Sequence, residues 1–167
     1  MTRTFASKSA EQQQPKKERE IKDISEIEDV ISSSDVCRIA FANDNVPYIV
    51  TMNFGYSGGD NKKLYFHCAR EGKKLEMIKK NNYVCFEFDT DHDLHEGKTA
   101  CGFGMSYRSV VGWGKIEIIT DDEGKKQGLN HLMSHYSDRD DFSYEKEILD
   151  KTIVLRLDIA GMKGKKC

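Results

Sequence analysis

Six runs rich in β-branched and aromatic residues recur along the chain, and this recurrence constrains the fold more than any other feature. Each run is bounded by polar or glycine-containing segments, which is typical of β-strands. The predicted strands cover residues 36–43, 47–56, 64–69, 83–90, 107–119 and 151–159. Helical patterns cover residues 25–34, 75–82 and 121–137. Neighbouring strands with few helices predict a mainly β (α+β) fold, an antiparallel β-barrel with peripheral helices rather than a doubly wound parallel sheet.

Local patterns predict how the chain turns and where its first helix begins. A polar segment at residues 44–46 separates the first two runs and favours an antiparallel hairpin, with Pro47 at the start of the second strand. Ser25 followed by Glu28 forms a capping-box pattern at the start of the first helix. The polar, glycine-containing residues 91–105 are expected to form a long connection.

The fifth run contains the only tryptophan, Trp113, between Gly112 and Gly114. Glycines inside a strand indicate a bulge or the close approach of another group. Without side chains at the flanking positions, a flat ring or another stretch of backbone can come close. The alternative is an ordinary aromatic residue in a sheet or a dimer interface. Both interpretations stay open from the sequence.

Length and composition favour one globular domain. The chain has 167 residues, with 38% hydrophobic residues, 32% charged residues and a formal net charge of −2. The polar residues 1–20 are expected to form a disordered N-terminal tail, and residues 21–167 a single domain. The sequence lacks the concentrated basic excess that is typical of nucleic-acid-binding proteins. No apolar run is long enough to span a membrane. The N-terminus lacks the apolar core of a secretory signal, so we expect a cytoplasmic protein.

Neither the cysteines nor the histidines predict a metal site. The five cysteines are widely spaced, without a Cys-x-x-Cys pair, and are expected to be reduced. His131 and His135 share a helix face, but Leu132 stands where a zinc-protease helix carries glutamate. Residues 91–96 hold several potential ligands without a partner motif. We therefore expect no metal.

The segment Gly72-Lys73-Lys74 comes directly before a short amphipathic helix. A helix N-terminus offers free backbone N–H groups and a partial positive charge, so it can hold a phosphate or another anion. Two lysine side chains would add formal charge to that site. The alternative is that these lysines are solvated surface cations on a short helix.

His67 lies in the third predicted strand, just before this turn. Alternation places Tyr65, His67 and Ala69 on one face of the strand. An imidazole there could hydrogen-bond a ligand or transfer a proton near neutral pH. A structural histidine bonded to a backbone carbonyl is the alternative, and the residues alone do not decide between the two.

Three sequence blocks taken together resemble a known family. The blocks are "CRIAFANDNVPYIVTMNFGY", "LYFHCAREGKKLEMIKKNNYVCFEFDTD" and "YRSVVGWGKIEI". In this order and spacing they resemble the pyridoxamine 5′-phosphate oxidase-like flavin-binding split barrels, and among these the nitroimidazole-resistance (Nim) branch. The resemblance covers residues 21–165. It implies a six-stranded antiparallel split β-barrel that works as a homodimer, with two FMN sites at the subunit interface.

The resemblance also implies roles for particular residues. The FMN phosphate would lie at Lys73 and Lys74, and His67 would face the cofactor or substrate cavity as the candidate proton donor. The flavin ring would lie along Val50, Thr51, Met52 and Asn53. The partner subunit would contribute Arg108, Ser109, Val110 and Trp113. A cation such as Arg108 near the ring would favour the reduced flavin.

The resemblance implies an FMN-dependent oxidoreductase that reduces a small flat acceptor such as a nitro-heterocycle. NADH and NADPH are both candidate donors, since no sequence feature selects one. The C-terminal residues 151–167 lack the arginine and histidine block of true pyridoxamine 5′-phosphate oxidases, so vitamin B6 oxidation is not expected. The alternative from another class is a non-catalytic module that binds or senses flavin or haem.

Overall fold

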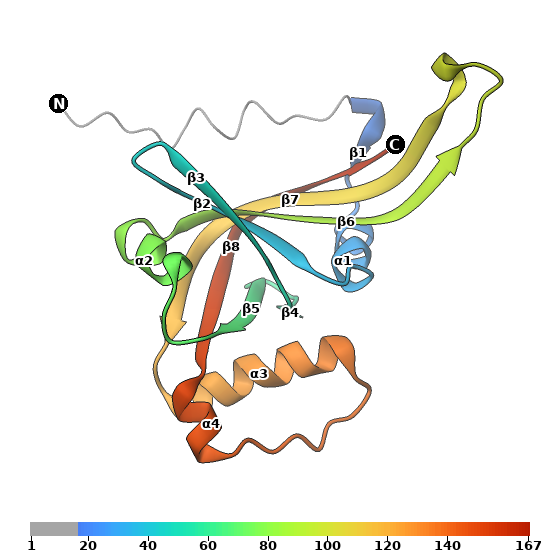
Figure 1. The fold of residues 1–167 in the computed structure, drawn as a ribbon. Coiled ribbons are helices and arrows are strands. Elements are labelled where there is room, and N and C mark those ends of the chain that lie inside the picture. Colours follow the sequence, from blue (N-terminus) through green and yellow to red (C-terminus); the bar gives the residue numbers. More distant parts are fainter. Residues whose placement is uncertain (1–16) are drawn as a thin grey trace.

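The computed structural model of the protein describes residues 17–167 (Figure 1). Its strands are β1 (Glu20–Ile21), β2 (Cys37–Asn43), β3 (Val46–Met52), β4 (Gly55–Ser57), β5 (Lys63–Cys68), β6 (Tyr83–His95), β7 (Gly104–Ile119) and β8 (Ile153–Lys166). Its α-helices are α1 (Ile24–Ser32), α2 (Lys73–Lys80), α3 (Asp122–Tyr136) and α4 (Lys146–Lys151). Two short 3-10 helices complete the elements, η3 (Lys17–Arg19) and η4 (Ala100–Gly102).

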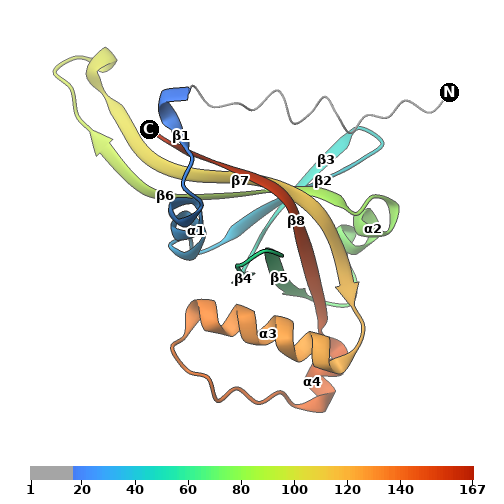
Figure 2. The same ribbon diagram turned by 180° about the vertical axis from the view of Figure 1, so that it is seen from behind.

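The strands form one antiparallel sheet that curls without closing. The strand order is β3-β2-β6-β7-β8-β5-β4, with β1 paired to β8. Because β3 and β4 are the two ends of this path, the barrel is split between them. Figures 1 and 2 show α3 and α4 together at one end of the molecule and α2 beside the β2–β3 hairpin. The predicted split barrel with peripheral helices is confirmed. Strand β1 is a short addition to the six predicted strands, and the predicted strand at residues 47–56 is divided into β3 and β4.

The core lies inside the curled sheet and follows the predicted alternation. In β6, Val84, Phe86 and Phe88 are 2%, 1% and 0% exposed, as expected for one face of the strand. The rings of Phe86 and Phe88 meet edge to face, with their centroids 5.8 Å apart. Phe54, at the break between β3 and β4, packs on Phe88 at 4.7 Å. A close-packed aromatic core therefore connects β6 with the chain at the break between β3 and β4.

The β2–β3 hairpin was predicted correctly and has a tight turn. Asp44 and Asn45 both have positive φ, of 50° and 61°. Two successive residues of this kind form the turn whose twist matches that of the flanking strands. The register then runs from Asn43 opposite Val46 to Cys37 opposite Met52. The hairpin therefore carries β3 along the open edge of the sheet.

The glycines around Trp113 are explained by close packing on both sides. A Cβ at Gly112 would overlap the ring of Phe86, and one at Gly114 would overlap the carbonyl of Asp158. The pairing of β7 with β8 shifts between Trp113 and Gly114, which is the predicted bulge. Both expected neighbours, a flat ring and another backbone, are present.

Three local predictions were wrong. The first helix begins at Ile24, because the Asp23 side chain accepts the Ser25 N–H at 2.9 Å; Ser25 is therefore inside the first turn and is not the cap. The predicted connection at residues 91–105 is shorter and covers residues 96–103, since β6 and β7 remain paired as far as His95 and Gly104. The last strand continues seven residues past its predicted end because its partners β7 and β1 continue with it.

The N-terminal prediction lies mostly outside the described residues. Residues 1–16 of the predicted tail are not described. Residues 17–19 form η3, and Glu20 pairs with Lys165 at the start of β1. Within residues 17–167, no helix is long and apolar enough to cross a membrane.

Candidate functional site

A cavity of about 350 Å³ lies where the barrel is split, between β3, the end of β5 and the start of α2. This volume is in the range of small-molecule and cofactor pockets, about 300–1,000 Å³. Its lining consists of Val36, Val50, Thr51, Met52, Asn53, His67, Cys68, Ala69 and Lys74. The structure therefore brings the predicted ring-binding segment, the histidine and one of the two lysines to the same cavity.

The β3 side of the cavity is an exposed sheet edge. In the described part of the chain β3 pairs with β2 and with no other strand. An edge strand presents backbone N–H and C=O groups that no neighbouring strand uses. Thr51 and Asn53 are exposed there, and Met52 is 8% exposed because it points into the core. Main-chain groups of this edge can thus bind the polar rim of a flat ligand.

The opposite end of the cavity is the N-terminus of α2. Gly72 is the N-cap residue, with φ of 138° and no side chain that caps the helix. A residue with a Cβ would be strained at this φ, and the space beside Gly72 is open. The first N–H groups of a helix lack partners inside the helix, so they can bind an anion that approaches Gly72.

The two lysines of this turn have different surroundings. Lys74 lines the cavity. Lys73 places its Nζ over the ring of Tyr48, 4.7 Å from the centroid, and does not line the cavity. Of the two predicted phosphate-binding lysines, Lys74 lines this cavity and Lys73 does not; phosphate binding by either stays a prediction.

His67 and Cys68 reach the cavity from the end of β5. Strand alternation buries Phe66 in the core and leaves His67 exposed, as predicted. Cys68 is half-buried, and burial raises the pKa of its thiol, while the nearby Lys74 ammonium lowers it by less. The thiol is therefore neutral near pH 7, and His67 is the titratable side chain of β5 that faces the opening.

The C-terminal end of α3 holds the wall of the cavity in place. The Tyr136 hydroxyl accepts the Phe54 N–H at 3.2 Å and donates to the Asp35 carbonyl at 2.8 Å. His135 Nε2 lies 2.8 Å from the Ser34 carbonyl oxygen, and its ring packs on Phe54 at 4.1 Å. These contacts fix the chain immediately before Val36 and immediately after Asn53. The sequence analysis missed this function of Tyr136, because only the fold brings α3 to those two segments.

Removing the Tyr136 hydroxyl is expected to loosen the cavity without unfolding the protein. In Tyr136→Phe the ring stays, but the Phe54 N–H and the Asp35 carbonyl lose their shared partner. We expect ligand affinity at the cavity to fall about 3–10-fold, because one neutral hydrogen bond contributes about 0.5–1.5 kcal/mol. Isothermal titration with FMN measures this. Tyr144→Phe removes a hydroxyl that bonds Asn130 and is the matched control; equal losses in both variants would contradict the assignment.

The two helical histidines have structural partners. The His131 ring stacks on Tyr65, 4.9 Å between centroids and 6° from parallel. Burial lowers the pKa of His131, and the Lys63 ammonium lowers it further. A Cβ at Gly55 would overlap the backbone of His131, which shows how closely α3 lies against β4. The i, i+4 spacing of His131 and His135 thus reflects packing of α3 on the sheet.

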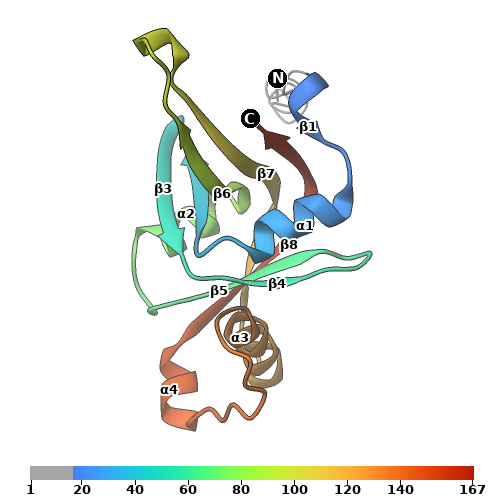
Figure 3. The ribbon, with the colours of Figure 1, turned by 90° about the vertical axis from the view of Figure 1, so that its right-hand side faces the viewer.

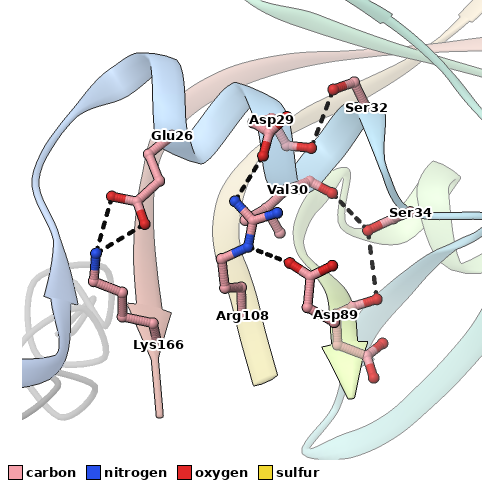
Figure 4. Close-up of polar contacts among 9 residues, drawn as sticks. Glu26, Asp29, Val30, Ser32, Ser34, Asp89, Arg108 and Lys166 are labelled. Atoms are coloured by element: carbon pink, nitrogen blue, oxygen red, sulfur yellow. Dashed lines mark hydrogen bonds and ion pairs between the residues drawn. The ribbon is translucent and has the colours of Figure 1, made fainter. Parts of the chain in front are cut away.

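Arg108 does not line the cavity in this chain, and Figure 4 shows its side chain beside Asp29 of α1. Its Nη1 donates to Asp29 at 2.6 Å, and its Nε donates to Asp91. These carboxylates raise the pKa of Arg108. The guanidinium therefore ties α1 to β7 and to the start of the β6–β7 projection, and its charge is already balanced by two carboxylates.

The other residues predicted for the partner subunit also lie outside this cavity. The Val110 side chain is fully buried in the core, so it is not available to a ligand. Ser109 and Trp113 are partly exposed and share the outer face of β7. Whether a second copy brings that face to the cavity stays a prediction.

The comparisons with known proteins agree with this geometry. Residues 23–166 match the family model described as pyridoxamine 5′-phosphate oxidase. A candidate 5-nitroimidazole antibiotic resistance protein from Bacteroides thetaiotaomicron is 35% identical, with 88% of this chain and 86% of that chain covered and a TM-score of 0.78. An FAD-binding protein from Mesorhizobium loti is 25% identical, with 89% and 97% covered and a TM-score of 0.63.

A more distant structure shares the fold alone. Flavocytochrome Anf3 from Azotobacter vinelandii is 18% identical, with 92% of this chain and 72% of that chain covered and a TM-score of 0.73. No protein of curated function matches the chain in sequence. The family match spans most of the chain and includes the residues of the cavity and the whole barrel. The chain belongs to the pyridoxamine 5′-phosphate oxidase family of split barrels.

Proposed function

We propose that this chain binds FMN in the cavity at the split and reduces a small flat acceptor. The observation that carries the proposal is that one cavity has two ends, each of which is complementary to a different part of a flavin nucleotide. The unpaired edge of β3 fits the polar rim of a flavin ring, and the N-terminus of α2 with Lys74 fits a phosphate. The FAD-binding relative from Mesorhizobium loti supports a flavin of either type.

A single terminal phosphate fits the α2 end of the cavity well. Gly72 lets an anion approach the helix start, and Lys74 supplies one positive charge beside it. Because FMN ends in a phosphate monoester, both features would act on its most charged group. This favours FMN over riboflavin, and a direct comparison with FAD decides between the two nucleotides.

We further propose a homodimer that meets through the outer face of the sheet. Cross-strand pairing aligns Ile49, Ala40, Cys85 and Trp113 in one row across β3, β2, β6 and β7. Ile49 is 65% exposed, and such an apolar row on a sheet face is typical of an interaction surface. A second copy on this face would bring Ser109 and Trp113 toward the partner's cofactor.

The proposed chemistry is electron transfer from a nicotinamide donor to an acceptor such as a nitroimidazole. A bound flavin supplies the ability to accept a hydride and pass on one or two electrons. The protein's part is to hold the ring along β3, to fix the phosphate at α2 and to limit water access to the cavity. His67 is proposed to hold or deliver the proton that accompanies reduction of the acceptor.

The test begins with the absorption spectrum of the purified protein. We expect flavin bands in the visible region, micromolar or tighter FMN binding, weaker FAD binding, and bleaching of the bound flavin by NADH or NADPH. Turnover of a nitroimidazole under anaerobic conditions completes the test. A bound flavin that no nicotinamide reduces would favour a binding or sensing module. A haem spectrum, or no ligand uptake at all, would overturn the proposal.

A further inference from the structure

Helix α3 is attached to the sheet by few buried apolar side chains. Figure 3 shows this helix nearly end-on, below β4 and β5. Its buried residues are Lys125, Gly128 and Leu132, and of these only Leu132 has a large apolar side chain. The Lys125 ammonium donates to the Leu149 carbonyl at 3.1 Å, which ties α3 to α4. Segments with few buried apolar contacts open at a low free-energy cost, so the other contacts of α3 decide how firmly it is held.

His131 forms one of these contacts with β5. Its ring stacks on Tyr65, with the ring centroids 4.9 Å apart and the planes 6° from parallel. Tyr65 is only 5% exposed. A Cβ at Gly128, one turn earlier on α3, would lie 3.0 Å from the same ring. His131 and Gly128 therefore hold the helix together against Tyr65.

The surroundings of His131 disfavour a positive charge. Lys63 lies on the same face of β5 as Tyr65 by alternation. Burial lowers the pKa of His131, and the Lys63 ammonium lowers it further. Arg156 and Asp158 of β8 act on Tyr65 from the other side, and they are bonded to each other at 3.0 Å. An imidazolium at this position would therefore face a cation and a buried ring.

The second histidine of α3 tolerates protonation. His135 Nε2 donates to the Ser34 carbonyl oxygen at 2.8 Å, since a carbonyl oxygen can only accept. Protonation of Nδ1 keeps this hydrogen bond, and the helix dipole favours a positive charge in the last turn. One turn before His131 stands Gln127, and β4 contributes Gly55, which has no side chain. Of the two histidines, His131 is therefore the one whose protonation opposes the packing of α3.

The same helix holds the wall of the cavity, since His135 bonds the Ser34 carbonyl and Tyr136 bonds the Phe54 N–H. These two residues follow His131 by four and five positions on one helix. We infer that protonation of His131 releases α3 from β5 and thereby loosens the wall of the cavity, so that mild acid weakens ligand binding there. The release is a property of the protein without ligand, and only its effect on flavin rests on the proposed function.

The direction of the pH effect follows from the protonation state that the fold favours. An imidazole has an ordinary pKa of about 6.5, and the pKa of His131 in the folded protein lies below its ordinary value. The released state therefore binds more protons than the packed state when the pH falls below about 6.5. Packing of α3 is at full strength above that pH and weakens below it, by at most about tenfold per pH unit for one proton.

The test is amide hydrogen exchange of the full chain without ligand, at about pH 7.5 and about pH 5.5, corrected for intrinsic exchange rates. We expect amides of α3 to lose about 3–10-fold protection in acid, while those of β2 keep theirs. His131→Phe keeps a flat ring on Tyr65 but cannot titrate, so its α3 should be equally protected at both pH values. His92→Gln, on β6, is the matched control and should respond like the unmodified protein.

A second variant tests the source of the effect. Lys63→Met removes the ammonium that disfavours the imidazolium, so the loss of protection in acid should become smaller. Equal protection of α3 at both pH values in the unmodified protein would overturn the inference. So would an acid loss of the same size in His131→Phe, because the titrating group would then lie elsewhere.

Riboflavin titration separates this inference from the proposed function. Riboflavin replaces FMN here because a phosphate monoester itself titrates near pH 6. Its dissociation constant should rise about 3–10-fold in acid for the unmodified protein and by less for His131→Phe. If α3 responds to acid but no flavin binds at any pH, the inference stands and the proposed function fails. If flavin binds but the protection of α3 does not depend on pH, the inference fails and the proposed function stands.

Discussion

His67→Gln is expected to lower turnover of a nitroimidazole acceptor about 100-fold, within the range for loss of a positioned proton donor. Glutamine keeps a polar side chain of similar reach but cannot titrate near neutral pH. His67 is exposed at the cavity, and Lys74 lies at the α2 end of the same lining, so FMN affinity should change by less than about threefold. Anaerobic steady-state kinetics and flavin titration measure the two effects separately.

The pH profile separates a chemical function of His67 from a structural one. The unmodified protein should show a limb that reports protonation of the imidazole, and that limb should be missing in His67→Gln. His95→Gln, at the end of β6 and outside the cavity lining, is the control and should keep both rate and profile. Equal turnover in His67→Gln and the unmodified protein would assign proton delivery elsewhere.

Lys74→Ala is expected to weaken FMN binding about 10–100-fold, because a hydrogen bond to a charged group contributes about 1.5–3 kcal/mol. Lys73→Ala should have a smaller effect, since its ammonium lies over the Tyr48 ring and outside the cavity lining. Lys80→Ala, in the last turn of α2, should have none. Flavin fluorescence titration at one ionic strength compares the three variants.

Riboflavin provides the control for this prediction. It has the ring of FMN but no phosphate, so Lys74→Ala should leave its affinity unchanged. If Lys74→Ala weakened riboflavin and FMN equally, the lysine would act on the ring or on the cavity wall. If neither ligand were affected, the phosphate would have to lie away from the start of α2.

Much of the barrel was predictable because its determinants are local. Alternation in β6 and the turn residues Asp44 and Asn45 act over a few positions along the chain. The glycine-rich surroundings of Trp113 likewise indicated close packing before the neighbours were known. Local patterns failed where a longer-range partner decides, as in residues 91–95 and 104–105, which stay in strand conformation because β6 and β7 pair with each other.

In the candidate site, too, local patterns predicted some features, and contacts between distant segments decided the others. Strand alternation placed His67 on the face that reaches the cavity, and the anion site at the turn of Gly72 stays a prediction. No sequence pattern could separate Lys74 from Lys73, because the Tyr48 ring that holds Lys73 comes from another strand. Tyr136 was missed for a similar reason, since its partners Phe54 and Asp35 lie 82 and 101 positions away along the chain.

The sequence by itself determined the strands, the short helix after Gly72, the titratable side chain at the end of β5 and the family resemblance. These follow from the alternation of apolar and polar residues, from the turn residues and from the order of the three sequence blocks, all of which are local properties of the sequence. The tertiary structure alone decided that the split opens between β3 and β4, that Arg108 is held by Asp29 and Asp91, and that Leu94, Phe103 and Met105 are exposed on the β6–β7 hairpin. Those outcomes depend on how the sheet curls and which distant segments then meet, and no local pattern encodes that geometry.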